Sequence, residues 1–272
     1  MALKDILLHL DSSPSCLGRL DLAIDLARAH GARLKGLYVV PHSFYAPRHG
    51  GLAEIGAGRM KEMFTEKTAA AGISADWVYV DWPVVGIALT EIITLYAYYT
   101  DLVIIGQPDQ SDQSNLTPAD LPERLGLAAG RPILVVPYTG KFPGTDERIM
   151  VGWREGREAV RALNDALPLL EKAKHVSIVS VGSTVVQADD SKGMGQQICD
   201  HLALHGVAAV HEQIPAPAGL PVGDLLLNFA CEQKMDLLVM GGYAQTRRGA
   251  FVLGPVAGHL LNHMTLPILL SH

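Results

Sequence analysis

The chain has 272 residues, 49% of them hydrophobic, and a formal net charge of −6 at pH 7 with a pI near 6.0. This length and apolar content suit two domains with sizeable cores, and the acidic balance leaves no basic surface for nucleic acid or a membrane, so neither is expected as a partner. The sequence has no signal-peptide pattern, no apolar run of about 18 residues and no disulfide or zinc spacing among its three cysteines, so a cytoplasmic protein is expected.

The first half of the chain alternates between strand-like and helix-like patterns. A short apolar run is followed by a loop of capping residues and then by the apolar spacing of a helix, which Gly31 ends. The same reasoning predicts strands over 6–10, 34–40, 77–80, 101–105 and 133–136, and helices over 17–30, 59–71 and 84–98. Residues 41–58, which include several glycines, are predicted to form a long surface loop, with a lid as the alternative.

The second half repeats this order of elements. It predicts strands over 149–153, 176–181, 210–213, 237–240 and 268–270, and helices over 157–171, 194–205, 222–234 and 255–263. Strands that alternate with helices imply right-handed crossovers and a parallel sheet covered on both faces. Each half therefore predicts a doubly wound α/β domain, with limits of 1–140 and 147–272 and a linker between them.

Two segments of the first half recur in the second half at one offset. Asp-Leu-Val-Ile-Ile-Gly at 101–106 returns as Asp-Leu-Leu-Val-Met-Gly at 236–241, and Arg-Pro-Ile-Leu-Val-Val at 131–136 returns as Leu-Pro-Ile-Leu-Leu-Ser at 266–271. Both pairs lie 135 residues apart, a period too long for a solenoid. The chain therefore reads as two copies of one folding unit.

A glycine-rich loop follows the fourth predicted strand of the second copy. In doubly wound sheets, ligands bind beyond the carboxyl ends of the strands, where the strand order reverses. In this loop Gly241 and Gly242 end the strand, and Gly254 opens the next helix. Glycines let backbone amides approach a phosphate closely, and a helix N-terminus adds free N–H groups. The loop predicts an anion or phosphate cradle, unless its glycines only turn the chain.

The tandem architecture, the segment 236–241 and the run from Gly241 through Gly254 to Leu-Pro-Ile-Leu at 266–269 resemble the universal stress protein family. The resemblance covers essentially the whole chain. It implies two adenine nucleotide alpha hydrolase-like, Rossmann-like domains packed as a pseudo-dimer, with residues 133–136 and 268–270 side by side. In the nucleotide-binding branch, the loop is Gly, two residues, Gly, nine residues, Gly and Ser or Thr, which hold the ribose and phosphates of ATP. An Asp after the first strand and a main-chain Val after the second hold the adenine.

The second copy matches this family pattern only in part at the phosphate end. Gly241 and Gly254 match and Gly242 lies beside the first of them, but Ala244 replaces the second glycine of the pattern. Pro255 stands at the Ser or Thr position and has neither an N–H nor a hydroxyl. The resemblance therefore implies at most a weak site for ATP or AMP here.

The adenine end of the second copy is also altered. Val181 remains in place as a backbone contact, whereas Arg154 stands where the family has Asp. Arg154, Arg247 and Arg248 could offer charge to an anion, or they could simply be solvated surface residues.

In the first copy the balance is reversed. Asp11 follows the first strand and Val39 ends the second, so the adenine end is formally present. The phosphate loop keeps Gly106 but has Asp109 at the second glycine and Ala-Asp at 119–120, and these carboxylates would repel a triphosphate. This copy is therefore not expected to bind ATP, and a nucleotide is expected in the second copy rather than in the first. Asp11 has the alternative role of a helix N-cap or a turn residue.

Two histidines lie four residues apart on the last predicted helix. His259 and His263 would share one helix face, as a metal pair requires, but the ligand count falls short of a site. Histidines that favour the C-terminal end of the helix dipole are the preferred interpretation, and no metal is expected.

Two functions from different classes fit this pattern. The resemblance favours a non-catalytic stress-response or regulatory binding protein, with a weak adenine-nucleotide or other anionic small-molecule site in the second copy. The alternative is a slow ATPase or phosphotransferase that uses the loop from Gly241 to Gly254, although no general base, carboxylate pair or P-loop lysine stands there. The two domains are expected to pair with each other, and a homo-oligomer is left open.

Overall fold

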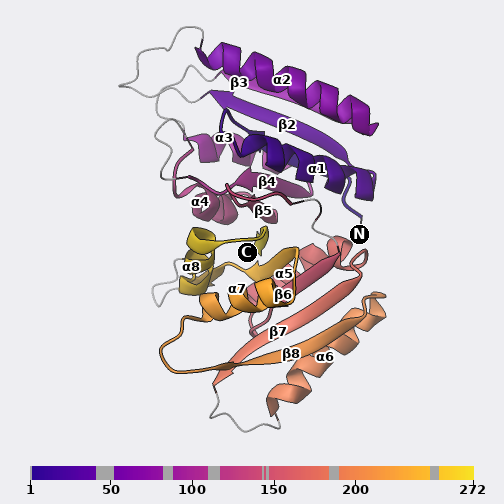
Figure 1. Ribbon diagram of the computed structural model, residues 1–272, viewed down its shortest axis with the longest axis vertical. Helices are drawn as coiled ribbons and strands as arrows, with labels where there is room; N and C mark the ends of the chain where they lie inside the picture. Colours follow the sequence, from indigo (N-terminus) through magenta and orange to yellow (C-terminus); the bar gives the residue numbers. More distant parts are fainter. Residues whose placement is uncertain are drawn as a thin grey trace. The chain divides into compact units, whose positions relative to one another are not determined.

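The chain divides into two α/β units, Ala2–Pro143 and Gly144–His272, each built around five parallel strands (Figure 1). The computed structural model describes residues 2–40, 52–81, 88–109, 117–142, 144, 147–183, 190–245 and 251–272. The domain limits predicted from the sequence, 1–140 and 147–272, remain a prediction. Within the described residues, no helix combines the length and the apolar character that crossing a bilayer requires.

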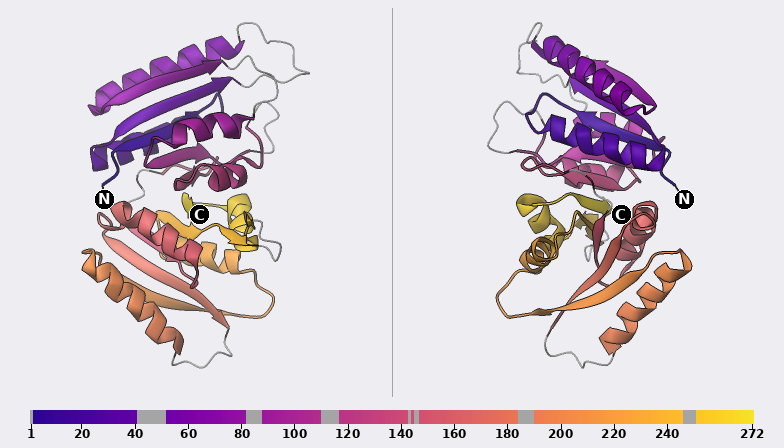
Figure 2. Two further views of the ribbon diagram at one scale, coloured as in Figure 1. Left: turned by 180° about the vertical axis from the view of Figure 1, so that it is seen from behind. Right: turned by 45° about the vertical axis from the view of Figure 1, so that its right-hand side comes forward.

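The N-terminal unit contains five strands in the order β3-β2-β1-β4-β5, and all described strand pairs are parallel. Its elements are β1 Asp5–Leu10, α1 Cys16–His30, β2 Arg33–Val40, α2 Leu52–Ala71, β3 Ala75–Asp81, α3 Leu89–Ala97, β4 Leu102–Gly106, α4 Leu121–Ala128 and β5 Ile133–Val136. Helices α1 and α2 contact each other on one face of the sheet, and α3 and α4 contact each other on the opposite face (Figure 2).

The C-terminal unit repeats this arrangement in the order β8-β7-β6-β9-β12, again with parallel neighbours. Its elements are β6 Arg148–Gly152, α5 Arg157–Leu170, β7 His175–Ser183, α6 Asp190–Leu204, β8 Ala209–Ala216, α7 Val222–Glu232, β9 Leu237–Gly241, α8 Pro255–His263 and β12 Ile268–Ser271. The predicted parallel, doubly wound fold is confirmed in both units.

Burial explains why the central strands are mostly apolar while the outer strands alternate. In β1 the side chains from Ile6 to Leu10 are all buried, because helices cover both faces of the sheet there. The outer strand β8 instead alternates half-buried and exposed residues along most of its length. The central strands therefore carry the core, and their carboxyl ends form the edge at which a doubly wound sheet binds ligands.

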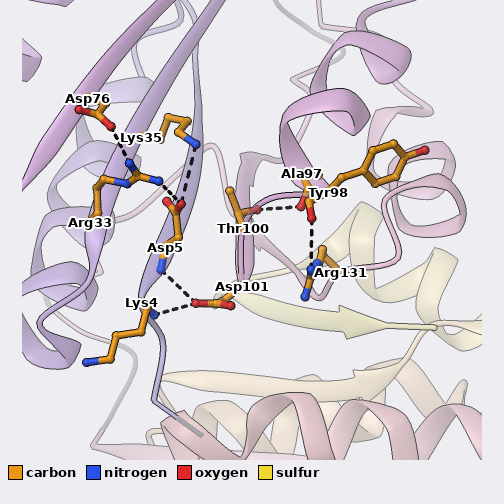
Figure 3. A network of polar contacts seen from close by, with 10 residues as sticks. All are labelled: Lys4, Asp5, Arg33, Lys35, Asp76, Ala97, Tyr98, Thr100, Asp101 and Arg131. Atoms are coloured by element: carbon orange, nitrogen blue, oxygen red, sulfur yellow. Dashed lines mark hydrogen bonds and ion pairs between the residues drawn. The ribbon is translucent and has the colours of Figure 1, made fainter.

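The repeated aspartate of the two similar segments has a structural role in each unit. Oδ2 of Asp101 accepts the backbone N–H groups of Lys4, at 2.7 Å, and of Asp5, at 3.0 Å (Figure 3). In the same way, Oδ2 of Asp236 accepts the N–H of Arg148 at 2.8 Å. Each aspartate thus ties the start of its unit's first strand to the start of the fourth, which accounts for its presence in both copies.

Three parts of the fold differ from the prediction. The predicted loop 41–58 ends early, because α2 begins at Leu52 and includes Gly56 and Gly58, while Gly50 and Gly51 lie outside the described residues. Buried side chains at Ala57, Met60 and Phe64 give this segment a helical stripe that outweighs its glycines.

The other two differences are elements that the pattern did not indicate. Helix α4 was not predicted in the first copy, although Leu121 and Leu125 are four residues apart and fully buried and Pro122 suits a first helical turn. In the second copy, the glycine-rich loop contains an antiparallel ribbon of β10 (Tyr243–Gln245) and β11 (Phe251–Leu253). Three-residue strands are too short to show an alternating pattern.

Candidate functional site

A cavity of about 390 Å³ opens at the carboxyl ends of β6, β7 and β9 in the C-terminal unit. Strand β6 lies between β7 and β9, so the chain leaves its carboxyl end toward one neighbour and returns on the other side. This is the switch in strand order at which doubly wound sheets hold their ligands. The cavity volume is within the range that accommodates a small organic molecule.

The walls of this cavity are mostly apolar, and charges gather on one side of it. The apolar wall consists of Trp153, Val179, Val181, Val222, Leu226, Met240 and Val256. Arg154, Glu155 and Glu158 also line it, and the first two are exposed. Such a site can take up a flat apolar ring and leave a polar substituent near the charged residues.

Three helices begin at this cavity, but their free donors are limited. Residues from the first turns of α5, α7 and α8 contribute to the lining, so three positive dipole ends face it. The N–H of Gly254 is already donated to the carbonyl of Gly242 at 2.9 Å, and Pro255 has no N–H. In α8 this leaves the amides of Val256 and Ala257 as first-turn donors toward a ligand.

Gly241 and Gly254, the two glycines of the loop that match the family pattern, have different surroundings. A methyl group at Gly241 would lie 2.6 Å from the carbonyl carbon of Glu158 and 2.8 Å from the nitrogen of Ala159, because the start of α5 packs directly on this residue. At Gly254 the nearest atom would be 3.5 Å away, and the backbone has an ordinary extended conformation with φ of −66°. The fold itself therefore requires glycine at 241 but not at 254.

Gly241→Ala is expected to destabilise the C-terminal unit by about 1–3 kcal/mol, because a side chain forced against backbone atoms shifts α5. Gly254→Ala is expected to lower stability by less than about 1 kcal/mol, mainly through the weaker N-cap preference of alanine. Urea unfolding of both variants measures the difference. Equal losses would show that close packing of α5 does not explain Gly241.

Five of the residues predicted from the sequence line this one cavity: Gly241, Gly242, Gly254, Val181 and Arg154. Ala244 lies in β10, paired with Val252, and Arg247 and Arg248 lie outside the described residues.

The remaining three predicted residues lie in the N-terminal unit, where Asp11 follows β1, Val39 is buried in β2 and Gly106 ends β4. Asp109 follows β4 and is half-buried, and Asp120 precedes α4, with a carboxylate oxygen 3.7 Å from a guanidinium nitrogen of Arg124.

Asp11 is engaged by its own unit. Its Oδ2 lies 2.7 Å from Nη2 of Arg19, and its Oδ1 accepts the backbone N–H of Ser13 at 2.9 Å. Of the alternatives for Asp11, the turn is the one observed, since α1 begins after Ser15. Burial, the largest single influence, would raise the pKa of the Asp11 carboxyl, but the charges of Arg19 and His9 and the hydrogen bonds from Ser13 together outweigh it, so this pKa lies well below its usual range.

No protein-family model and no curated protein matches the chain. A universal stress protein from Archaeoglobus fulgidus DSM 4304 has a TM-score of 0.73 at 15% identity, covering 98% of this chain and 97% of that one. A putative universal stress protein from Pseudomonas aeruginosa UCBPP-PA14 has a TM-score of 0.61 at 18% identity, covering 99% and 93%. The chain has the universal stress protein fold. A functionally unknown protein from Pseudomonas aeruginosa PAO1 has a TM-score of 0.62 at 17% identity over 99% and 92%.

One buried residue of this universal stress protein fold was missed by the sequence analysis. Arg19 is 2% exposed and lies on the buried face of α1 beside Leu20 and Ala23. A single arginine on a helix usually marks the solvated face, so the residue type argued against burial. Comparison of the copies could have found it, because the matching apolar stripe of α5 has alanine at position 162.

The histidine pair of α8 has other contacts in this universal stress protein fold. Nε2 of His259 lies 2.6 Å from Oδ1 of Asp224 on α7, and Nδ1 of His263 lies 2.9 Å from the carbonyl oxygen of His259. The two imidazole rings stack with centroids 4.3 Å apart. Among the described residues, no group of three or more His, Cys, Asp or Glu side chains is arranged to hold a metal ion.

Proposed function

We propose that this protein is a non-catalytic binding protein of the universal stress type, with a stress-response or regulatory role, whose C-terminal unit holds an adenine nucleotide or a related small molecule. The observation that supports this most is the cavity at the carboxyl ends of β6, β7 and β9, which gathers five residues chosen from the sequence. The valines of β7 and Met240 offer an apolar wall suited to an adenine ring, and we propose Val181 as its backbone contact.

The charges around the cavity favour weak binding of a phosphate chain. Arg154 is the one cationic side chain among the described lining residues, and Glu155 and Glu158 oppose it. A carboxylate a few ångströms from a phosphate costs on the order of 1 kcal/mol or more at an effective dielectric of about 20. AMP, with fewer negative charges, is therefore a better candidate than ATP.

Binding rather than turnover is proposed because the described lining lacks the groups that phosphoryl transfer uses. It contains no lysine to hold a β- or γ-phosphate and no histidine to act as a base. Glu155 and Glu158 lie on the side that also carries Arg154, where they weaken rather than assist the positioning of a triphosphate.

Calorimetric titration with adenosine, AMP and ATP tests this function. Arg154→Ala is expected to weaken ATP binding about fivefold and Glu158→Gln to strengthen it about fivefold, because each change alters one charge near the phosphates. Adenosine, which has no phosphate, is expected to respond to neither. Arg124→Ala, an exposed arginine on α4, is the control that leaves all three affinities unchanged. Absence of binding by all three compounds at millimolar concentration would reject the nucleotide, and hydrolysis of ATP would reject the non-catalytic role.

A further inference from the structure

The N-terminal unit contains a buried guanidinium at the place that corresponds to the cavity. Nε of Arg19 donates to the carbonyl oxygen of His9 at 3.1 Å, at the end of β1, and Nη2 donates to Oδ2 of Asp11 at 2.7 Å. A methyl group at Gly106, the last residue of β4, would collide with Nη1. The Arg19 side chain therefore lies against the carboxyl ends of both β1 and β4.

Alignment of the two copies shows what Arg19 replaces. Leu237 of β9 corresponds to Leu102 of β4, because it lies at the 135-residue offset of the repeated segments. Leu102 pairs with Ile6 of β1 and Leu237 pairs with Ile149 of β6, so Ile6 corresponds to Ile149. Ile6 and Ile149 are 143 residues apart. Applied to the following helices, this offset aligns the buried residues of α1 with those of α5, and Arg19 then corresponds to Ala162.

The two units therefore have different side chains at the carboxyl ends of their central strands. The C-terminal unit has small side chains on this stripe of α5, Ala162 and the cavity-lining Ala159, and its cavity is open. There the position of Asp11 is taken by Arg154, which is exposed. The N-terminal unit instead has a large cation, Arg19, together with a carboxylate that neutralises it.

A second contact closes the N-terminal unit from the side of β2. Oγ of Ser12 and Oη of Tyr38 are 2.6 Å apart and hydrogen-bonded, and Gly56 of α2 packs on both. A methyl group at Gly56 would lie 2.8 Å from the Ser12 oxygen and 3.2 Å from the Tyr38 oxygen. The beginning of α2 thus covers the loop that follows β1.

We propose that the N-terminal unit has a guanidinium-binding site and that the side chain of its own Arg19 occupies this site in place of an external ligand. The site consists of the Asp11 carboxylate, the His9 carbonyl and the flat surface of Gly106. Carboxylate and carbonyl oxygens in this arrangement match the forked donors of a guanidinium, which an ammonium cannot satisfy equally. The N-terminal unit therefore needs no external ligand.

Chemical rescue of Arg19→Ala tests this proposal. The substitution removes an ethylguanidinium fragment, so added ethylguanidinium is expected to raise the Tm of the variant by about 5 °C at about ten times its Kd. Hydrogen–deuterium exchange of peptides from β1 and α1 locates the effect. Titration up to about 50 mM stays far below the molar concentrations at which guanidinium salts denature proteins.

Three controls decide the result. Arg33→Ala removes a half-exposed arginine that pairs with Asp5 and Asp76, and it is expected to show no rescue. Ethylammonium and sodium chloride at equal ionic strength are expected to leave the Tm of Arg19→Ala unchanged. The double variant Asp11→Asn, Arg19→Ala is expected to show no rise in Tm with ethylguanidinium. If Arg19→Ala is unfolded alone, its folded fraction by circular dichroism is followed during the titration. No gain in Tm or folded fraction, or an equal gain with ethylammonium, would overturn the proposal.

Discussion

Asp11→Ala is expected to destabilise the N-terminal unit by about 3–5 kcal/mol, because it leaves the Arg19 guanidinium buried without its counter-charge. Arg19 is 2% exposed and Asp11 18% exposed, so water cannot replace the missing carboxylate at the inner side of the pair. The hydrogen bond of Arg19 to the His9 carbonyl does not neutralise the charge, because the carbonyl group is itself neutral.

The same pair can be removed together at much lower cost. Replacing a buried ion pair with apolar groups of similar volume is often neutral, so Arg19→Met combined with Asp11→Ala is expected to recover most of the lost stability. Urea unfolding of the wild type, both single variants and the double variant gives a coupling energy of at least about 2 kcal/mol. Additive losses would show that the two side chains act independently and that the ion pair is not what holds Arg19 in place.

Acidification from about pH 6.5 to pH 4 is expected to lower the stability of the N-terminal unit by about 3 kcal/mol through His9. Burial, more than the opposing charges of Asp11 and Arg19, lowers the pKa of this imidazole to about 4. In the unfolded chain His9 therefore binds a proton near pH 6.5, whereas in the folded unit it binds one only near pH 4. Because the unfolded state gains protons first, stability falls as the pH falls through this window. Asp11, whose pKa is also lowered, adds its loss only below the usual pKa of a carboxyl, near pH 4.

His9→Leu is expected to remove this pH dependence, because leucine has a similar volume and does not titrate. Unfolding by urea at pH 7, 6, 5 and 4, followed by amide exchange of β1, measures the slope in the N-terminal unit. His205→Asn, a change at an exposed position directly after α6, is the matched control and should keep the slope. A slope that persists in His9→Leu would assign the acid sensitivity to another group.

The sequence predicted the fold and part of the site for one physical reason. Buried parallel strands are continuously apolar and alternate with helices, so their order and sheet type follow from periodicity. Because the carboxyl ends of such strands share one edge, residues as distant as Arg154, Val181 and Gly254 could be expected together, and they line one cavity. Their role in binding stays a prediction.

What the sequence could not supply depends on tertiary contacts. The glycines of α2 favour a loop locally, and only packing of Phe64 and its neighbours makes that segment a helix. Arg19 reads as a surface residue until the position of Asp11 beside it is known. In both places a local preference is overridden by contacts that form only in the folded unit.

The hydrogen bonds by which Asp101 and Asp236 connect the first and fourth strands of their units have an evolutionary consequence. Each of them is completed by residues of its own unit, so a gene segment that encodes one unit carries everything this connection requires. Duplication of such a segment yields two self-sufficient modules, and mutations can then accumulate at the ligand-binding edge of either one without opening its sheet. The aspartates at the strand starts are alike in the two modules, whereas at the strand ends one module has the buried Arg19 and the other has an open cavity.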